Sequence, residues 1–154
     1  MATQLQLRKG TKIQNDAFTG AEAEITYDST SKGLRLHDGV KQGGYLIDVV
    51  VDWQAPTAEN NYTWYRKYSS GWVEQGGHVS DSSGDGSVSL PIAMLDTNYY
   101  IFAINEQTSN ENAWGWVYIR KDTKTTTGFG LNSRYASGTA AYLRARWMVC
   151  GVAA

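Results

Sequence analysis

Alternation of apolar and polar residues dominates this chain, and helical periodicity is nearly absent. The clearest alternation is in residues 142–149, where Leu143, Ala145, Trp147 and Val149 oppose Tyr142, Arg144 and Arg146. Such a period of two predicts a strand with one buried face. Residues 140–146 would also suit a helix by propensity, but the apolar run 147–150 and the flanking glycines favour the strand.

Three further segments carry strand patterns. Residues 45–53 alternate, with Tyr45, Ile47, Val49, Val51 and Trp53 on one side, which predicts a single strand with one buried face. Residues 98–104 are apolar on both sides and predict a central strand. Residues 114–120 alternate again, so the pattern as a whole predicts an all-β fold.

Turn signals separate these segments and divide the chain. Asp38-Gly39 predicts a two-residue hairpin, and residues 127–137 are expected to form a loop. Residues 54–61 contain Pro56 and little that can be buried, so they are interpreted as a linker. The predicted domains are therefore 1–52 and 53–154.

The N-terminal piece contains too few large apolar residues to close a core alone. They are Leu5, Leu7, Ile13, Phe18, Ile25, Leu34 and Leu36. A single cysteine excludes an intrachain disulfide, so association of subunits is the remaining way to stabilise this piece. The C-terminal piece holds all six tryptophans and is expected to fold as a sandwich or a small barrel.

Composition and charge limit the classes of partner that this chain is expected to bind. The 154 residues include 14 Lys+Arg and 15 Asp+Glu, a net charge of -1. Without a basic field, neither nucleic acid nor anionic lipid is an expected partner. No run approaches the roughly 18 apolar residues of a membrane span, so membrane insertion is not expected. No signal peptide is recognised, so we expect synthesis in a cytoplasm.

No cofactor is expected. Cys150 lies in the apolar run 147–150 and is interpreted as a buried, inert thiol. The predicted linker separates His37 from His78, so they are not expected to share a metal, and a local hydrogen-bonding role is expected for His37. Asp81 and Asp85 lack the spacing of an EF-hand loop, so no calcium ion is expected.

The first 44 residues resemble the short N-terminal module of bacteriophage fibre and tropism-determinant proteins. The resemblance rests on Leu7–Thr11, Gln14-Asn15, Phe18–Gly20, Glu24–Asp28, Leu34–Gly39 and Gly43-Gly44. It implies a small intertwined trimeric β module that attaches to other tail proteins. Leu7, Phe18, Ile25 and Leu36 are then the candidate trimer contacts.

A second set of motifs resembles the C-terminal β-sandwich tip of phage fibres. These motifs are Trp64–Gly77, Val88–Pro91, Asn98–Ile101 and Lys124–Phe129. The resemblance implies an antiparallel sandwich, a homotrimer, a place in the virion tail after synthesis in the bacterial host cytoplasm, and contact with a host surface glycan or protein.

Candidate receptor-binding residues follow from loops, because recognition usually resides on loops held by a rigid scaffold. Residues 105–112 are polar and lie between two predicted strands, although a solvated connection is the competing interpretation. The candidates, which include two nearby aromatic residues, are Asn105, Glu106, Thr108, Asn110, Asn112, Trp114 and Tyr135.

The exposed aromatic residues have two interpretations, subunit contact or sugar platform, and contact is favoured for any single residue. Trp72 is expected to anchor the sandwich rather than to bind a sugar.

Two alternatives to a receptor-binding protein remain open. One is a tail connector or decoration protein without host contact. The other is a depolymerase, which needs two carboxylates about 5–9.5 Å apart. No spacing among Glu74, Asp96, Glu106, Glu111 and Asp122 identifies such a pair, so no catalytic residue is expected.

Overall fold

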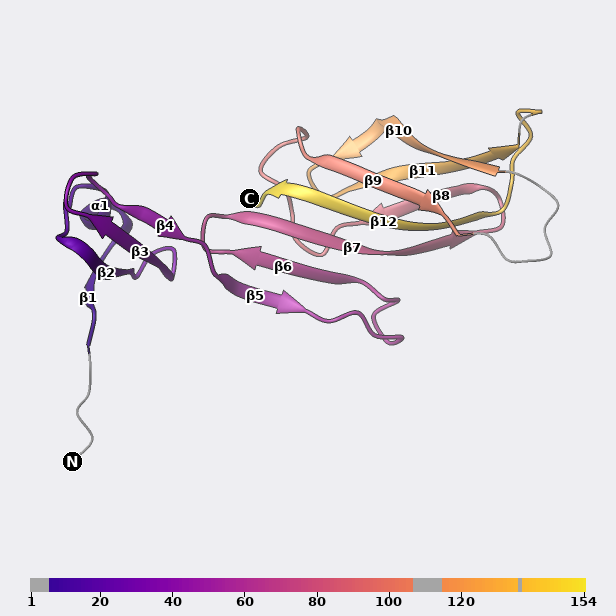
Figure 1. The fold of residues 1–154 in the computed structure, drawn as a ribbon. Coiled ribbons are helices and arrows are strands. Elements are labelled where there is room, and N and C mark those ends of the chain that lie inside the picture. Colours follow the sequence, from indigo (N-terminus) through magenta and orange to yellow (C-terminus); the bar gives the residue numbers. More distant parts are fainter. Residues whose placement is uncertain (1–5, 107–114, 136) are drawn as a thin grey trace. The chain divides into compact units, whose positions relative to one another are not determined.

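The computed structural model describes residues 6–106, 115–135 and 137–154 (Figure 1). The chain separates into two compact units. Unit 1 comprises residues 1–52 and 68–71, and unit 2 comprises residues 53–67 and 72–154. The fold class predicted from the alternation is confirmed to the extent that the chain is mostly β: every element of the described chain except one short helix is a strand.

Unit 1 is a small four-stranded sheet with one helix. The strands are β1 (Arg8–Gly10), β2 (Glu22–Asp28), β3 (Gly33–Asp38) and β4 (Tyr45–Ile47), in the order β1-β2-β3-β4. β1 is parallel to β2, whereas β3 is antiparallel to both of its neighbours. The helix α1 (Lys12–Asp16) starts with a capping box, in which Thr11 and Gln14 exchange side-chain and backbone hydrogen bonds.

The interior of unit 1 is polar. Its buried side chains are Asn15, Thr26, Asp28, Arg35, His37 and Ser69, and no described residue of this unit belongs to the buried hydrophobic core. Hydrogen bonds and ion pairs therefore replace apolar packing inside this sheet.

Two expectations for residues 38–53 are wrong. The predicted single strand 45–53 is two strands of different sheets, β4 and β5 (Val50–Gln54), and no residue of either strand is fully buried. The chain breaks at Asp48, whose carboxylate accepts hydrogen bonds from the Ser69 hydroxyl and from Ser70. The predicted two-residue hairpin is also wrong, because six residues, 39–44, separate β3 from β4.

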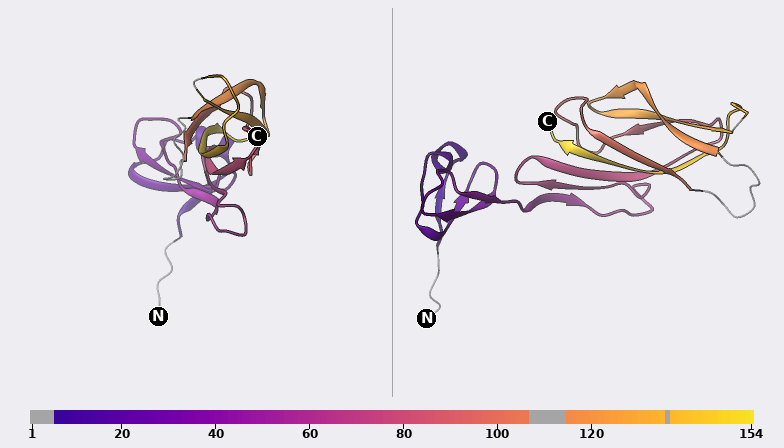
Figure 2. Two further views of the ribbon diagram at one scale, coloured as in Figure 1. Left: turned by 90° about the vertical axis from the view of Figure 1, so that its right-hand side faces the viewer. Right: turned by 45° about the horizontal axis from the view of Figure 1, so that its top comes forward.

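Unit 2 contains two antiparallel sheets that pack face to face (Figure 2). The three-stranded sheet has the order β10-β11-β8 and contains β8 (Asp85–Ser89), β10 (Gly115–Thr125) and β11 (Gly128–Tyr135). The five-stranded sheet has the order β5-β6-β7-β12-β9. Besides β5 it contains β6 (Trp64–Tyr68), β7 (Trp72–Asp81), β9 (Tyr100–Asn105) and β12 (Leu143–Val152).

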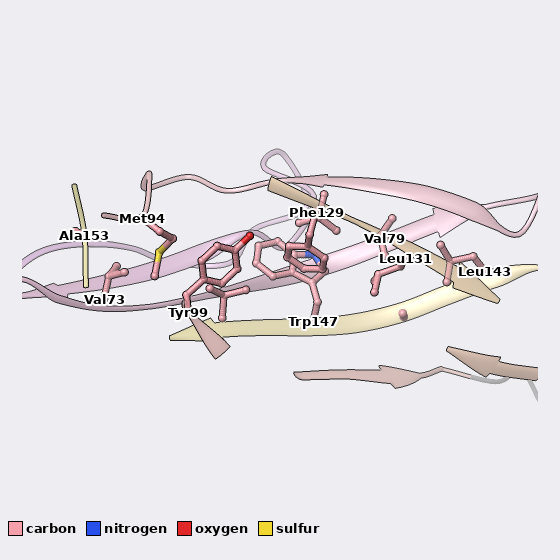
Figure 3. Close-up of a cluster of buried hydrophobic side chains, with 12 residues drawn as sticks. Val73, Val79, Met94, Tyr99, Phe129, Leu131, Leu143, Trp147 and Ala153 are labelled. Atoms are coloured by element: carbon pink, nitrogen blue, oxygen red, sulfur yellow. The ribbon is translucent and has the colours of Figure 1, made fainter. Parts of the chain in front are cut away.

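Side chains from both sheets form one core (Figure 3). The predicted alternation of β12 is confirmed, with Leu143, Ala145, Trp147 and Val149 all buried. Trp147 meets Phe129 of the opposite sheet edge to face, with ring centroids 5.9 Å apart. The core of this chain therefore belongs to unit 2.

Two other segments differ from expectation. Residues 98–104 do not form a central strand. β9 is an edge strand of the five-stranded sheet, and its Tyr100, Phe102 and Ile104 are exposed. Residues 127–137 are not a loop, because most of them form β11, where Phe129 and Leu131 point into the core. The positions between and beside Phe129 and Leu131 hold glycines and polar residues that also favour turns, so the strand was not recognised in the sequence.

Candidate functional site

The predicted recognition loop is only partly described. Asn105 ends β9 and Glu106 follows it, whereas Thr108, Asn110, Asn112 and Trp114 lie outside the described residues. Asn105 alternates with Ile101 and Ala103 and is half-buried on the side of the strand that faces the core. Glu106 is therefore the candidate of this loop whose carboxylate is both described and exposed.

Glu106 takes part in a charged cluster on the five-stranded sheet. Both of its carboxylate oxygens accept hydrogen bonds from Arg146, at 3.1–3.3 Å. His78 Nε2 lies 3.5 Å from the same carboxylate, and the Arg146 guanidinium lies over the Tyr62 ring at 5.6 Å. The cluster joins β7, β12 and the end of β9, and it presents a fixed bidentate pair with an aromatic ring.

Tyr135 lies at the same end of unit 2. It ends β11, is half-buried and pairs with Gly115 at the start of β10. Ala145 of β12 pairs with Asn105, which places the end of β9 beside the start of β12. The strand register therefore brings Asn105, Glu106 and Tyr135 to one end of the sandwich.

The sequence did not predict a surface on the side of the five-stranded sheet that faces away from the core. We call it the outer face. Tyr100, Phe102 and Ile104 cover its β9 edge with exposed fractions of 65%, 57% and 66%. Across the register, Cys150 pairs with Tyr100, and Met148 pairs with Phe102. The apolar alternation of β9 was visible in the sequence, but only the strand order shows that this side is uncovered.

Two residues expected in the core lie on the outer face instead. Trp72 lies at the start of β7, opposite Val152, and is 36% exposed. The tryptophan that packs in the core of the sandwich is Trp147. Cys150 is half-buried. Burial and then the charge of Glu74 raise the pKa of its thiol.

Unit 1 also has an uncovered apolar side. Ile25, Leu36 and Tyr45 pair across β2, β3 and β4, and all three are exposed. A second row beside it consists of Tyr27, Leu34 and Ile47. We call these six residues the apolar face of unit 1.

The four predicted contact residues of unit 1 do not all belong to this face. Ile25 and Leu36 are neighbours on it. Leu7 is 39% exposed just before β1. Phe18 is half-buried on the other side, where its ring meets His37 at 5.3 Å and the Arg8 guanidinium at 4.6 Å.

The expected hydrogen-bonding role of His37 is confirmed. The Gly20 N–H donates to its Nδ1 at 3.2 Å, and Nε2 lies 3.0 Å from the Thr26 hydroxyl. That hydroxyl donates to Asn15 Oδ1, so Nε2 is the nitrogen that carries the proton. His37 thus links β2, β3 and, through Thr26 and Asn15, α1.

Among the described residues, no group of three or more His, Cys, Asp or Glu side chains is arranged to hold a metal ion. Within the same part of the chain, no helix is long and apolar enough to cross a membrane.

Comparisons with known proteins identify relatives of both units. Residues 5–41 match the family model of the major tropism determinant N-terminal domain. The chain is 31% identical over 119 residues to the tail fiber receptor-binding protein of Bordetella phage BPP-1. The aligned region is 70% of this chain, but the chain spans only 31% of that relative. The resemblance to phage fibre proteins inferred from the motifs is confirmed.

Solved tail-fibre structures are similar at a lower level. An N-truncated R2-type pyocin tail fibre has a TM-score of 0.44 and 19% identity, over 67% of this chain and 39% of that one. The C-terminal part of the Pseudomonas aeruginosa R1 pyocin fibre also has a TM-score of 0.44, with 21% identity over 67% and 29% of the two chains. Similarities this weak carry no argument about function.

Proposed function

We propose that this chain, a relative of phage tail-fibre receptor-binding proteins with a major tropism determinant N-terminal domain, is a receptor-binding component of a phage tail that attaches the virion to a bacterial surface. Its receptor is a surface glycan or an outer-surface protein. The chain acts by adhesion and not as an enzyme.

The length of the aligned region is the observation that carries this proposal. Identity of 31% extends over 119 residues, far more than the stretch 5–41. The similarity to a receptor-binding protein therefore reaches beyond the N-terminal module into the sandwich of unit 2.

The construction of unit 1 supports a role in assembly. Its interior is polar, and Ile25, Leu36 and Tyr45 lie exposed on its apolar face. A face of this kind is stabilised when another protein surface covers it. In the proposal, unit 1 associates as an intertwined homotrimer and attaches to other tail proteins, with Leu7, Ile25 and Leu36 among its contacts.

Unit 2 presents the binding surface in this proposal. Asn105, Glu106 and Tyr135 lie at one end of a rigid sandwich. In the sequence, Glu106 comes just before the segment that contains Thr108, Asn110, Asn112 and Trp114. Three copies of a weak site on one assembly raise the total affinity far above that of one copy, because the second and third contacts form within a single complex.

Adsorption is the direct test. Purified full-length chain is expected to bind host cells and to compete with the phage for adsorption. A Glu106→Gln variant is expected to bind more weakly, whereas Glu59→Gln in the exposed 57–61 turn serves as the matched control. Absence of binding at saturating concentration contradicts the proposal.

Further measurements distinguish this proposal from the two alternatives, the connector or decoration protein and the depolymerase. A connector or decoration protein binds another tail protein, and substitutions at residues 105–112 then leave the host range unchanged. A depolymerase releases reducing sugar from the host polysaccharide, whereas we expect no release.

A further inference from the structure

A pocket opens on unit 2 at the end opposite to Glu106 and Tyr135. It encloses about 190 Å³ where β12 ends and β7 and β9 begin. Its lining comes from these three strands and from the 95–99 segment before β9, namely Trp72, Leu95, Asp96, Asn98, Tyr99, Tyr100, Gly151 and Val152. None of the residues predicted from the sequence to bind a receptor lines it.

Two aromatic residues of the outer face line this pocket. Trp72 is opposite Val152 on β12, and Tyr100 is opposite Cys150 two positions earlier. Trp72 and Tyr100 are 36% and 65% exposed. Exposed rings that line a small cavity offer apolar surface and can stack with C–H groups of a ligand.

The rim of the pocket is polar. Oδ1 of Asp96 accepts a 2.7 Å hydrogen bond from the Asn98 N–H. Within the described part of the chain, neither the other oxygen of Asp96 nor the side-chain amide of Asn98 has a hydrogen-bonding partner. A carboxylate oxygen accepts, and an amide both donates and accepts, so the pair matches adjacent hydroxyl groups.

The segment that carries this rim is anchored to the core at its start. Gln75 is fully buried, and its side chain donates to the Ile92 carbonyl at 2.9 Å and accepts from the Ile92 N–H at 3.0 Å. The Met94 N–H donates to the Thr126 carbonyl, and the Leu95 N–H donates to the Val152 carbonyl, both at 2.8 Å. The chain is therefore fixed immediately before Asp96.

Tyr99, whose side chain lies among the core residues (Figure 3), fixes the other end of the rim. Its hydroxyl donates to the Thr125 and Gly128 carbonyls at 2.8 and 3.1 Å. Lys124 Nζ lies over its ring at 4.2 Å and donates to its carbonyl. Because the rim is held at both ends before any ligand arrives, binding there costs little ordering entropy.

We propose that this pocket binds one neutral pyranose unit of a surface glycan, with Trp72 and Tyr100 against its C–H face and Asp96 and Asn98 on its hydroxyls. This inference rests on the proposed receptor-binding function and adds a site and a ligand class to it. The Asp96 charge disfavours acidic sugars, and the polar rim distinguishes the pocket from the purely apolar β9 edge.

Saturation-transfer difference NMR on the full-length chain tests the pocket directly. The probes are free D-glucose, D-galactose, D-mannose and N-acetyl-D-glucosamine. We expect saturation of the ring C–H protons of at least one sugar, and about a tenfold weaker affinity in Tyr100→Ala and in Asp96→Ala. Phe102→Ala is the matched control, because Phe102 lies on the same strand and the same face but outside the pocket.

Two results of the saturation-transfer experiment overturn the pocket. One is no transfer to any of the four sugars. The other is equal transfer in the wild type, Tyr100→Ala and Asp96→Ala, with an unchanged melting temperature showing that both variants are folded. If Tyr100→Ala lowers the sedimentation mass while transfer persists, Tyr100 contacts a neighbouring subunit, and the site is likewise rejected.

Host-cell adsorption separates this inference from the function on which it rests. If the wild type and both pocket variants adsorb equally well, the receptor-binding function stands and the pocket does not. If the wild type does not adsorb, the proposed function itself fails.

Discussion

Arg35 donates a 2.9 Å hydrogen bond through Nη2 to Oδ2 of Asp28, a carboxylate with no exposed surface. The same nitrogen lies 2.7 Å from Asp16 Oδ1, and Nη1 donates to the Gly43 carbonyl. One guanidinium thus joins β2, β3, α1 and the 39–44 loop. The interior of unit 1 depends on this ion pair because none of the described residues of the unit belongs to the buried hydrophobic core.

Acid should destabilise unit 1 through Asp28. Burial raises the pKa of this carboxyl, but hydrogen bonds from the Ser31 N–H, Arg35 and the Thr30 N–H outweigh it, so its pKa is lowered. A lowered pKa stabilises the fold above the unfolded-state value of about 4, and that stability is lost as the pH falls through the folded-state pKa. The protection factors of the amides in residues 22–38, which allow for the slower intrinsic exchange in acid, should therefore fall below about pH 4.

Asp28→Asn should weaken this acid dependence and destabilise unit 1, while Asp16, whose pKa is also lowered by Lys12 and Arg35, keeps part of it. An unpaired buried charge costs about 3–5 kcal/mol, and the lower end is expected because Asp16 still pairs with Arg35. Tryptophan fluorescence is the internal control, since all six tryptophans lie within the bounds of unit 2. Equal protection of the 22–38 peptides in the variant and the wild type would contradict the role of the pair.

Leu36→Glu should dissociate the proposed homotrimer. A charge in the middle of the apolar face opposes its burial against another subunit, whereas in a lone chain Leu36 is already 41% exposed and the substitution should cost little. Sedimentation velocity is the measurement. Val40→Glu is the control, because Val40 is 84% exposed in the loop of the same unit. A wild-type chain that sediments as a folded monomer would refute the homotrimer.

Gln75→Leu should destabilise unit 2. The substitution leaves the N–H and carbonyl of Ile92 without the partner they have now, and each buried unsatisfied group costs about 1–3 kcal/mol. We expect a loss of about 2–4 kcal/mol in urea unfolding followed by tryptophan fluorescence. Gln54→Leu removes a single part-buried hydrogen bond to Thr63 and should cost about 1 kcal/mol or less.

The Glu106–Arg146 pair should contribute little to stability. Both side chains are about half exposed, and exposed pairs typically contribute about 0–1 kcal/mol. A double-mutant cycle with Glu106→Gln and Arg146→Met should give a coupling energy in that range. A larger coupling would identify a structural role, and any loss of adsorption in Glu106→Gln would then not identify a receptor contact.

The sequence alone was sufficient for the β-rich class and for the strand that organises the core. The alternation in β12 survives in the structure because one side of that strand meets the opposite sheet and the other does not. The resemblance to fibre modules was also visible, since its motifs occur in order along the chain.

Which apolar sides are covered was not predictable from local patterns. Residues 45–53 and 98–104 have good strand patterns, yet the first is split by the Asp48 contacts with Ser69 and Ser70, and the second is a sheet edge. Both outcomes depend on residues about twenty or more positions away.

The candidate site, too, was predictable from the sequence only in part. Glu106 and Tyr135 are recognisable in the sequence as polar and aromatic residues near predicted turns, but their common location follows from strand register. The pocket is lined by Trp72, by residues between Leu95 and Tyr100, and by Gly151 and Val152, which are three separate parts of the chain. Local alternation determined which residues form strands, because side-chain period is a property of the backbone. Only the tertiary structure decided which faces are buried, because burial depends on which distant strands become neighbours.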